Sequence, residues 1–412
     1  MTKSPDPTVL VAGAGVVGLA VAALLATGRC ADRMRVQVLE ARALPRWRAQ
    51  ELDLRVYALS RASQELLERL GVWPNVTARR ACAYRRMHVW EGEDPAGAAL
   101  EFDSADIGEP DLGHIVEDNL LRTTLADVLA AAPNAELTLG AELESIEVGR
   151  REAIVLLRNG GSARGTLVVA ADGSDSAVRR LLDLPVMSHS YEQTAVVTHA
   201  ASALSHRETA WQRFLPGGPL AFLPLSDGRS SVVWSLPSER AERLIAAEPD
   251  AFVAELQAAS AGALGALGPC AARAGFPLHA LHATHYCAPR AALVGDAAHT
   301  VHPLAGQGMN LGLLDAAAIA AVIEDAVLAG EDPGDLKVLR RYERERKGGN
   351  LEMLLALDAL HRLFQLPGWV APLRAAGLKA VDSSGLAKRV LMQRALGLNA
   401  GSKNRLRWSH AQ

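Results

Sequence analysis

The most constraining feature of this chain is a glycine pattern near its beginning, Gly13-x-Gly15-x-x-Gly18. A β-type run, TVLVA, precedes the pattern, and an alanine- and leucine-rich run, VVGLAVAALLA, overlaps its end. A second β-type run, RVQVL, leads into Glu40, 22 residues after Gly18. Glycines between a strand and a helix, followed by a strand and an acidic residue, are typical of a dinucleotide-binding α/β fold. The glycines allow a tight turn, a close approach of backbone amides to a pyrophosphate and close helix packing, while Glu40 can accept hydrogen bonds from a ribose.

The same region has a second interpretation, because residues 8–28 carry no charge over 21 positions. A run of this length can span a membrane. The preceding MTKSPDP is a poor signal-peptide flank, since it holds one Lys, one Asp and two prolines. The glycines also divide the run into a β-type half and a helical half. We therefore expect a buried strand followed by a buried helix.

Composition limits the function classes. The chain has 412 residues, 49% of them hydrophobic, which is enough for two or three globular domains. The net charge of −3 gives no global basic field, so we expect no nucleic-acid partner. The four cysteines form no CxxC pair and no cluster with histidine at zinc spacing. A disulfide framework and a metal site are not expected, and a cytoplasmic location fits this cysteine usage.

Later parts of the chain indicate how the domains are organised. Residues 166–170 and 291–294 are short apolar runs typical of buried strands, and residues 191–236 alternate between apolar and polar side chains, as an antiparallel sheet does. We expect a nucleotide-binding domain made of separate segments, with a sheet domain inserted into it and helices after it. The expected segments are 1–79, 111–185 and 286–345 for the nucleotide domain, 80–110 and 186–285 for the substrate domain, and 346–412 for the C-terminal helical region.

Two further motifs carry a family resemblance. Ala171-Asp172-Gly173 follows the run at 166–170, and Gly295-Asp296 follows the run at 291–294. With the first glycine pattern, they resemble the three fingerprints of class A flavin hydroxylases, whose fold relative is para-hydroxybenzoate hydroxylase. Local stretches narrow the resemblance to the ubiquinone-biosynthesis hydroxylases of the UbiH/UbiF/VisC type. These stretches are residues 53–60, 70–73, 113–117, 222–225 and 295–310.

The resemblance implies an α/β chain, with a Rossmann-like FAD-binding domain, an inserted antiparallel β-sheet substrate domain and C-terminal helices. It implies non-covalent FAD and hydroxylation of the aromatic ring of a polyprenylated phenol or quinol by O2, through a flavin C4a-hydroperoxide. NAD(P)H is the expected reductant. Since no second GxGxxG follows a strand, NAD(P)H has no dedicated nucleotide domain in this chain.

Several residues are expected to bind the cofactor. Asp296 follows a buried strand, where a carboxylate can accept hydrogen bonds from ribityl hydroxyls or can cap a helix. Arg55, by resemblance, reaches the pyrophosphate, although a surface ion pair with Asp53 is an alternative. Backbone amides at 306–310 can stabilise negative charge on a reduced flavin. The full expected set is Gly13, Gly15, Gly18, Glu40, Arg55, Asp172, Gly173, Asp296, Gly306, Gly308, Met309 and Asn310.

Two of the expected contacts leave alternatives open. Asp172 and Gly173 resemble the family's strand-end motif, but a plain Asp-Gly turn explains the same pair. Asp118 stands where relatives usually carry Asn, another amide or Arg near the flavin, so the contact at this position is in doubt.

No acid–base residue stands out. His299, His302 and Pro303 flank the expected flavin loop and are the only candidates for a catalytic role, although a lone histidine is more often structural. His279, His282 and His285 form an HxxHxxH run. In a strand the middle histidine would point away from the other two, so a metal triad is not expected.

The last stretch differs from the rest in charge. Residues 346–412 hold 11 Lys or Arg and 3 Asp or Glu, a net charge of +8. A helical cap packed on the flavin domain and a basic surface that touches an anionic membrane face or an assembly partner are both compatible with this stretch. A homo-oligomer or a biosynthetic complex is possible on the same grounds. Two rival functions remain open, namely hydroxylation of a small soluble aromatic compound and a flavin-binding scaffold subunit.

Overall fold

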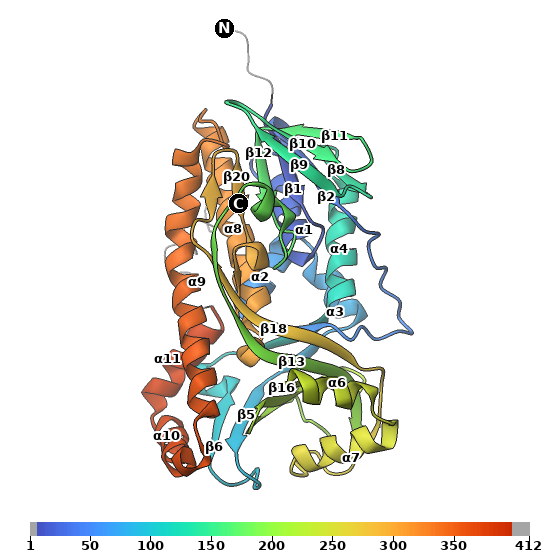
Figure 1. Ribbon diagram of the computed structural model, residues 1–412, viewed down its shortest axis with the longest axis vertical. Coiled ribbons are helices and arrows are strands. Elements are labelled where there is room, and N and C mark those ends of the chain that lie inside the picture. Colours follow the sequence, from blue (N-terminus) through green and yellow to red (C-terminus); the bar gives the residue numbers. More distant parts are fainter. Residues whose placement is uncertain (1–5, 398–412) are drawn as a thin grey trace.

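The computed structural model describes residues 6–397, which form two lobes (Figure 1). The first lobe contains a six-stranded sheet in the order β19-β20-β12-β1-β2-β8. The strands from β20 to β8 pair in parallel, and β19 adds an antiparallel edge. Its strands are β1 (Thr8–Ala12), β2 (Arg35–Glu40), β8 (Ala135–Leu139), β12 (Leu167–Ala170), β19 (Cys287–Ala288) and β20 (Ala291–Leu293).

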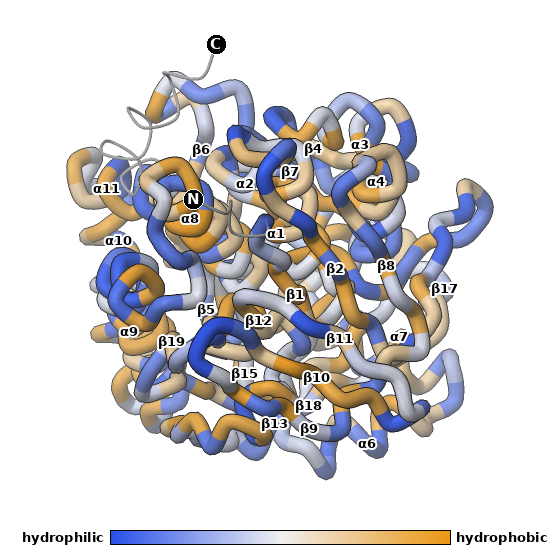
Figure 2. The backbone as a smooth tube through the Cα atoms, turned by 90° about the horizontal axis from the view of Figure 1, so that it is seen from above, coloured by the Kyte–Doolittle hydropathy of each residue, from blue (hydrophilic) through white to orange (hydrophobic). Residues whose placement is uncertain are grey.

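Helices cover this sheet because its central strands are apolar on both faces, as parallel strands usually are. Hydrophobic stretches run along β1, β2 and β10 when the molecule is seen from above (Figure 2). Helix α1 (Val16–Thr27) is almost fully buried and packs against α4 (Asp118–Ala131) and α8 (Gln307–Leu328). The uncharged run at 8–28 is therefore a buried strand and helix, as expected, and no helix within residues 6–397 is long and apolar enough to cross a membrane.

The second lobe is built on a larger, mostly antiparallel sheet in the order β21-β18-β13-β16-β15-β14-β5-β6, with β17 paired to β13. Helices α6 (Ser238–Ala246) and α7 (Pro249–Ala259) cover its outer face. The strands are β5 (Arg86–Glu91), β6 (Ala99–Asp103), β13 (Val186–Ser202), β14 (Thr209–Leu215), β15 (Gly218–Pro224), β16 (Ser230–Pro237), β17 (Leu267–Cys270), β18 (Ala274–Ala283) and β21 (His299–Thr300).

Two small sheets complete the strands. One has the order β11-β10-β9 and the other the order β3-β7-β4. Their bounds, and those of the remaining short helices, are β3 (Val56–Leu59), β4 (Cys82–Tyr84), β7 (Gly113–Glu117), β9 (Leu143–Val148), β10 (Ala153–Leu157), β11 (Ser162–Gly165), α2 (Arg61–Arg69), α3 (Trp73–Arg79) and α5 (Ala177–Leu181).

The structure moves two of the expected domain boundaries. Strand β4 was expected to begin the substrate domain at residue 80, but it pairs with β7 in the small sheet that also holds β3. The expected boundary between 345 and 346 falls inside α9 (Leu336–Gln365), a continuous helix of 30 residues. Helix α9 runs along both lobes (Figure 1), so its first half belongs to the nucleotide-binding lobe and its second half to the substrate lobe. The chain then continues into α10 (Ala371–Ser383) and α11 (Gly385–Ala395).

A buried carboxylate joins α8 and α9 to the strand end at Gly295. Asp315 on α8 is fully buried. Its Oδ2 accepts a hydrogen bond from the Gly295 N–H at 3.1 Å and lies 2.5 Å from His299 Nε2. Its Oδ1 accepts from Arg346 Nε at 2.8 Å and from Asn350 Nδ2 at 3.0 Å, both on α9. Burial alone would raise the pKa of Asp315, but His299 and Arg346 hold that pKa well below its usual range.

Most basic residues of the C-terminal stretch have partners within the chain. Lys388 pairs with Asp106 at 3.2 Å and with Asp382 at 3.4 Å, and Arg394 pairs with Glu352. The net charge of +8 therefore overstates the unpaired basic surface of this stretch, because Lys388 and Arg394 are paired with acids within the chain. Lys403, Arg405 and Arg407 lie outside the described residues.

We predict that Arg346→Met lowers the free energy of unfolding by about 3–5 kcal/mol at pH 7, because it removes one partner of a buried ion pair. The matched control is Arg341→Met on the same helix, whose ion pair with Glu331 is exposed, and this variant should change the free energy of unfolding little.

The pH dependence gives this prediction a second check. Since the pKa of Asp315 is depressed in the folded chain, its contribution is present above the unfolded pKa of about 4 and is lost as the pH falls further. The difference between Arg346→Met and the parent should therefore shrink below about pH 4 in denaturant unfolding with excess FAD. A constant difference at all pH values would contradict this assignment.

Candidate functional site

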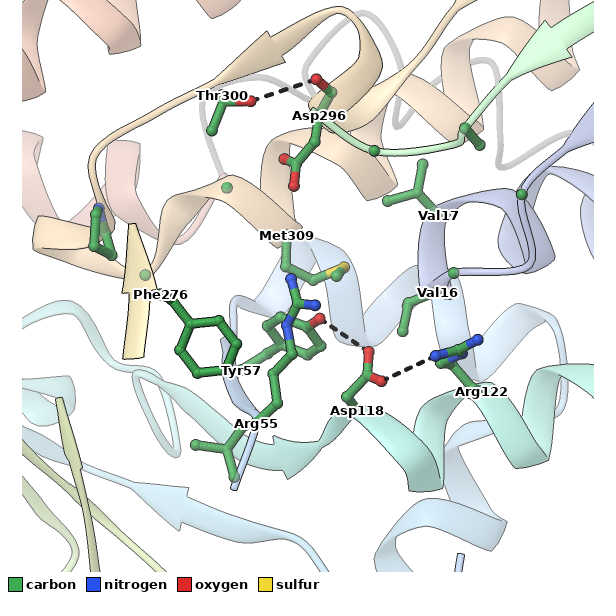
Figure 3. Close-up of a pocket in the computed structure, with 18 of the residues that line it drawn as sticks. Val16, Val17, Arg55, Tyr57, Asp118, Arg122, Phe276, Asp296, Thr300 and Met309 are labelled. Atoms are coloured by element: carbon green, nitrogen blue, oxygen red, sulfur yellow. Dashed lines mark hydrogen bonds and ion pairs between the residues drawn. The ribbon is translucent and has the colours of Figure 1, made fainter. Parts of the chain in front are cut away.

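One cavity of about 850 Å³ lies between the strand ends of the first lobe and the inner face of the larger sheet (Figure 3). It brings together ten of the twelve residues expected to bind the cofactor, and Pro303 also lines it. The ten are Gly13, Gly15, Glu40, Arg55, Asp172, Gly173, Asp296, Gly306, Gly308 and Met309. Gly18 and Asn310 are not among the lining residues.

The three glycines of the first turn have different roles in the packing. Gly13 has φ +97°, and a Cβ built there would lie 2.6 Å from the Ala171 carbonyl oxygen. A Cβ on Gly18 would collide with the Gly13 carbonyl oxygen. Gly15, at the start of α1, has open space within 4 Å. The turn therefore needs Gly13 and Gly18 for packing, while Gly15 leaves room at a helix N-terminus for a negatively charged group.

Glu40 and Arg122 hold this turn from two sides. The Ala14 N–H donates to Glu40 Oε2 at 2.7 Å, and Arg122 Nε donates to the Ala14 carbonyl at 3.1 Å. Asp118 lies 3.6 Å from Arg122 and accepts a hydrogen bond from Tyr57 Oη at 2.9 Å (Figure 3). The aspartate that departs from the usual family residue thus has defined partners in this chain. Sequence reasoning missed Tyr57 and Arg122, since neither lies in a glycine motif.

Arg55 lies in the cavity rather than in a surface ion pair. Its guanidinium is 5.6 Å from the centre of the Tyr57 ring, and Figure 3 shows it between that ring and Met309. Asp53 accepts hydrogen bonds from the Arg55 and Asn119 backbone N–H groups and forms no ion pair with the Arg55 guanidinium. Tyr57 and the nearby carboxylates raise the pKa of Arg55 above its ordinary value, against the effect of burial. A fixed positive charge therefore lines the cavity.

Two carboxylates follow the ends of neighbouring strands. Asp296 lies in a short 3-10 turn after β20, and its carboxylate points into the cavity (Figure 3). Burial raises the pKa of Asp296, and His299 and Arg55 oppose this shift. Asp172 Oδ2 accepts a hydrogen bond from the Val178 N–H at 3.1 Å, which caps the turn into α5, whereas its buried Oδ1 has no partner among the described residues. Both sites leave carboxylate oxygen available to a bound polar group.

The turn at Gly306 and the first turn of α8 form another wall of the cavity, through Gly306, Gly308 and Met309. Gly306 has φ +60° and begins α8. Asn310 faces away from the cavity, because its Oδ1 accepts from the Ser60 N–H at 2.9 Å and from Ser63 Oγ at 2.7 Å. Its Nδ2 donates to the Ala58 carbonyl at 3.0 Å. The side chain of Asn310 therefore holds the start of α8 against β3 and α2, while the expected role of its backbone amide stays a prediction.

The histidine candidates do not face the cavity. His299 is buried against Asp315, and His302 packs between Tyr191 and His361. Burial, with His361, lowers the pKa of His302 to about 3. Of the expected catalytic candidates, only Pro303 lines the cavity. Groups of three or more His, Cys, Asp or Glu that could hold a metal ion are absent from residues 6–397.

The larger sheet supplies the opposite wall. Alternate residues of its strands face the cavity, because side chains in a strand alternate between the two faces. Large residues such as Trp234 and Phe222 pack on the other face, under α6 and α7. The side chains that face the cavity are mostly small, which leaves room for a flat ligand, and Gln212 is the longest polar side chain among them. They are Ala195, Val197, Ala210, Gln212, Pro219, Ala221, Leu223, Ser231, Val233, Ser235, Phe276 and Leu278.

One protein-family model matches most of this chain. The family described as "FAD binding domain" matches residues 6–351. The chain belongs to this family. The Gly15 turn, the Asp296 carboxylate and the Gly306 loop fit FAD, because they offer a helix N-terminus, an acceptor and an open backbone wall within one cavity.

Several named proteins are similar to this chain over most of its length. It is 37% identical over 401 residues to the 3-demethoxyubiquinol 3-hydroxylase of Escherichia coli, covering 97% of this chain and 100% of that protein. It is 36% identical to the ubiquinone hydroxylase UbiL of Rhodospirillum rubrum, covering 96% and 91%. It is 32% identical to the human mitochondrial ubiquinone biosynthesis monooxygenase COQ6, covering 93% and 91%. The expected resemblance and the expected class, an FAD-dependent hydroxylase, are confirmed.

Solved structures share the fold. PqsL, a probable FAD-dependent monooxygenase from Pseudomonas aeruginosa, superposes with a TM-score of 0.74 at 26% identity, covering 91% of this chain and 99% of PqsL. The p-nitrophenol 4-monooxygenase PnpA from Pseudomonas putida gives a TM-score of 0.77 at 21% identity, covering 95% and 98%. These likenesses confirm the predicted α/β fold with an inserted sheet and C-terminal helices.

We predict opposite effects for two glycine substitutions in the same turn. Gly18→Ala should destabilise the fold by several kcal/mol, because its Cβ meets backbone that cannot move away. Gly15→Ala should leave the thermal midpoint of the FAD-free protein within a few degrees of the parent, while FAD affinity falls about tenfold or more. Circular dichroism melting and flavin titration measure the two effects. Equal FAD affinity in Gly15→Ala and the parent would contradict the placement of the pyrophosphate.

A further prediction concerns Asp296→Asn. Because burial raises the pKa of Asp296, the stability linked to its protonated form is present below about pH 4 and is lost as the pH rises through the folded pKa. The FAD-free variant should therefore melt above the parent at pH 7. Its FAD affinity should fall by about 10- to 100-fold, since a charged acceptor is lost. Asp127→Asn, at an exposed position on α4, is the control and should change neither quantity.

Proposed function

We propose that this FAD-dependent hydroxylase adds a hydroxyl group to the aromatic ring of a polyprenylated phenol or quinol in ubiquinone biosynthesis. The observation that carries the proposal is a cavity in which Gly306 and the start of α8 face the small-residue wall of the larger sheet. An aromatic ring in that gap lies between the flavin-binding residues and the sheet. The names of the similar proteins from Escherichia coli, Rhodospirillum rubrum and human support the substrate class.

The residues of the first lobe would hold FAD. Gly15 would leave space for the pyrophosphate, Glu40 would reach the adenosine ribose and Asp296 the ribityl chain. Arg55 would contact the pyrophosphate with its guanidinium. When bound and reduced, FAD supplies the activation of O2. The loop at 306–309 would lie against the ring system with its backbone amides.

The second lobe would bind the ring and exclude water. Val197, Leu223 and Val233 make this wall apolar, and a dry wall protects a reactive oxygen species from water. We propose that the amide of Gln212 binds a ring hydroxyl and so orients the carbon to be hydroxylated. The cavity offers no histidine for acid–base work, and we assign no side chain to the removal of the phenolic proton.

NAD(P)H is the proposed reductant. The chain has one glycine fingerprint of the dinucleotide type, so NAD(P)H would approach the flavin transiently rather than occupy a second nucleotide fold. We place the protein in the cytoplasm, at the inner face of the membrane that holds the polyprenylated substrate. Self-association or assembly with other biosynthetic proteins is compatible with this location.

The direct test uses purified FAD-loaded protein, NADH or NADPH, isotopically labelled O2 and a short-tailed polyprenyl phenol. We expect substrate-stimulated oxidation of the reductant and one labelled oxygen atom in the product, read by mass spectrometry. Ala221→Phe, which fills the ring gap, should retain FAD and lower turnover by about tenfold or more. Ala246→Phe, exposed on α6, is its control and should match the parent.

Two outcomes would contradict the proposal. Labelled oxygen incorporated only into an unprenylated aromatic compound would favour a hydroxylase of small soluble substrates. Bound FAD without any substrate-stimulated oxidation of NADH or NADPH would favour a scaffold subunit. Accumulated quinone intermediates in hydroxylase-deficient strains that carry this gene would identify the ring carbon.

A further inference from the structure

Exposed apolar side chains are concentrated at one place on this protein. Residues 6–397 contain sixteen large hydrophobic side chains that are exposed, and nine of them fall between residues 355 and 391. Trp369 is 82% exposed, Leu386 78% and Leu373 74%. A soluble monomer rarely leaves so many large apolar side chains together in water. We call these nine residues the C-terminal apolar face: Leu355, Leu360, Leu363, Leu366, Trp369, Leu373, Leu386, Val390 and Leu391.

The exposure follows from how α9, α10 and α11 pack. These helices lie together along one side of the molecule (Figure 1). The inner side of α9 is already occupied, with Phe364 stacked on Phe214 of β14 at 3.5 Å between ring centres. Arg374 of α10 turns inward to Glu91 with 3.0 Å between Nε and the carboxylate. A surface helix normally shows a polar face to water. Here the outward positions are apolar as well, so the packing of the lobe leaves an apolar face without a partner within the described chain.

The charges near this face are largely neutralised. Asp358 pairs with Arg362 at 2.9 Å, Asp382 pairs with Lys388, and Glu352 pairs with Arg394. Each of these three carboxylates thus has a cation beside it. Lys379 and Arg389 are exposed and make no ion pair within residues 6–397. Because these carboxylates are paired, the residues around the apolar face repel an anionic surface weakly or not at all. The unpaired charges among them, those of Lys379 and Arg389, are positive.

A hydrophobic cluster packs between the helices of the apolar face and the cavity. A continuous hydrophobic cluster packs beneath α9 and α10 and contains Met353, Leu357 and Leu378. The same cluster contains Met87 and Leu304, which line the cavity. One apolar cluster therefore contains residues of α9 and α10 together with residues that line the cavity. This continuity fits a substrate with a long apolar tail better than it fits a protein partner.

We propose that the C-terminal apolar face inserts into the interfacial region of a lipid bilayer and so places the cavity next to a membrane-dissolved substrate. The choice of lipid rests on the proposed function, because a polyprenylated ring partitions into the bilayer. Exposed Trp and Leu side chains with neighbouring Lys and Arg are the composition of interfacial helices. Burial of apolar side chains drives this insertion, so it should depend little on salt. Attachment through the net charge of +8 in residues 346–412 would instead weaken as salt increases.

The test is co-flotation of the full-length holoenzyme with vesicles of phosphatidylethanolamine and phosphatidylglycerol, at low and high salt. We expect the parent to float at both salt concentrations. A triple variant, Trp369→Ser with Leu373→Ser and Leu386→Ser, should lose about 100-fold in vesicle partitioning, because three apolar side chains no longer leave water. The control variant, Met187→Ser with Leu204→Ser, removes side chains that are 60% and 55% exposed elsewhere, and it should float as the parent does.

A second readout does not depend on these multiple substitutions. Brominated lipid should quench the tryptophan fluorescence of the parent, and Trp369→Phe should lose that quenching while still floating. The triple variant should keep its FAD and its turnover of a short-tailed substrate in solution, since it leaves the cavity unchanged. Only turnover of a long-tailed substrate in vesicles should fall.

Three outcomes would overturn the inference. The triple variant could float as the parent does, or the control variant could lose binding equally. The parent could fail to float while light scattering shows a dimer that the triple variant abolishes, in which case the face binds a second copy of this chain. Failure of the parent to hydroxylate any polyprenyl phenol in solution would instead contradict the proposed function, and the flotation result would remain separate from it.

Discussion

The buried carboxylate of Asp315 is the contact on which the arrangement of the cavity depends. It accepts hydrogen bonds from the backbone at Gly295, beside Asp296, and from Arg346 on α9, and it holds His299 in place. A buried carboxylate stays charged only if several such partners stabilise it. Without them its pKa rises and it becomes protonated. Here Asp315 lies on α8, and its partners lie just after β20 and on α9. The electrostatic requirement of one side chain thus ties the strand end at β20, helix α8 and helix α9 into one unit behind the flavin loop.

The glycine turn depends on a different constraint, which is steric. Gly13 and Gly18 are packed so closely against backbone that no side chain fits, and this closeness brings β1, α1 and β12 together. Gly15 stands between them with open space on its cavity side. The contrast explains how one motif serves both stability and binding. The fold requires two of the glycines, Gly13 and Gly18. The third, Gly15, leaves room for a negatively charged group at the start of α1.

Long strands and one long helix couple the two lobes. β13 and β18 extend along each other over many residues, and α9 spans both lobes (Figure 1). The cavity therefore lies between parts that are held rigidly, with a small-residue wall on one side and the Gly306 loop on the other. The apolar cluster under α9 reaches from this cavity toward the exposed C-terminal face. One helix thus contributes Arg346 to the flavin side and apolar side chains to the opposite end.

Sequence by itself determined the nucleotide-binding lobe, the FAD cofactor and the family, because motifs such as Gly13-x-Gly15-x-x-Gly18 depend on local turn geometry that is written in adjacent residues. It also determined which residues approach the cavity in most cases, since the carboxyl ends of parallel strands meet at one edge of a sheet. Tertiary structure alone decided that Asn310 and His299 face away from the cavity, because their partners, Ser60 and Asp315, are chosen by packing. The tertiary structure likewise decided that Tyr57 faces the cavity. The surface character of the C-terminal region was also decided by the tertiary structure, since net charge counts residues but not ion pairs. Lys388 and Arg394 are paired with acids elsewhere in the chain, and nine large apolar side chains between residues 355 and 391 face water.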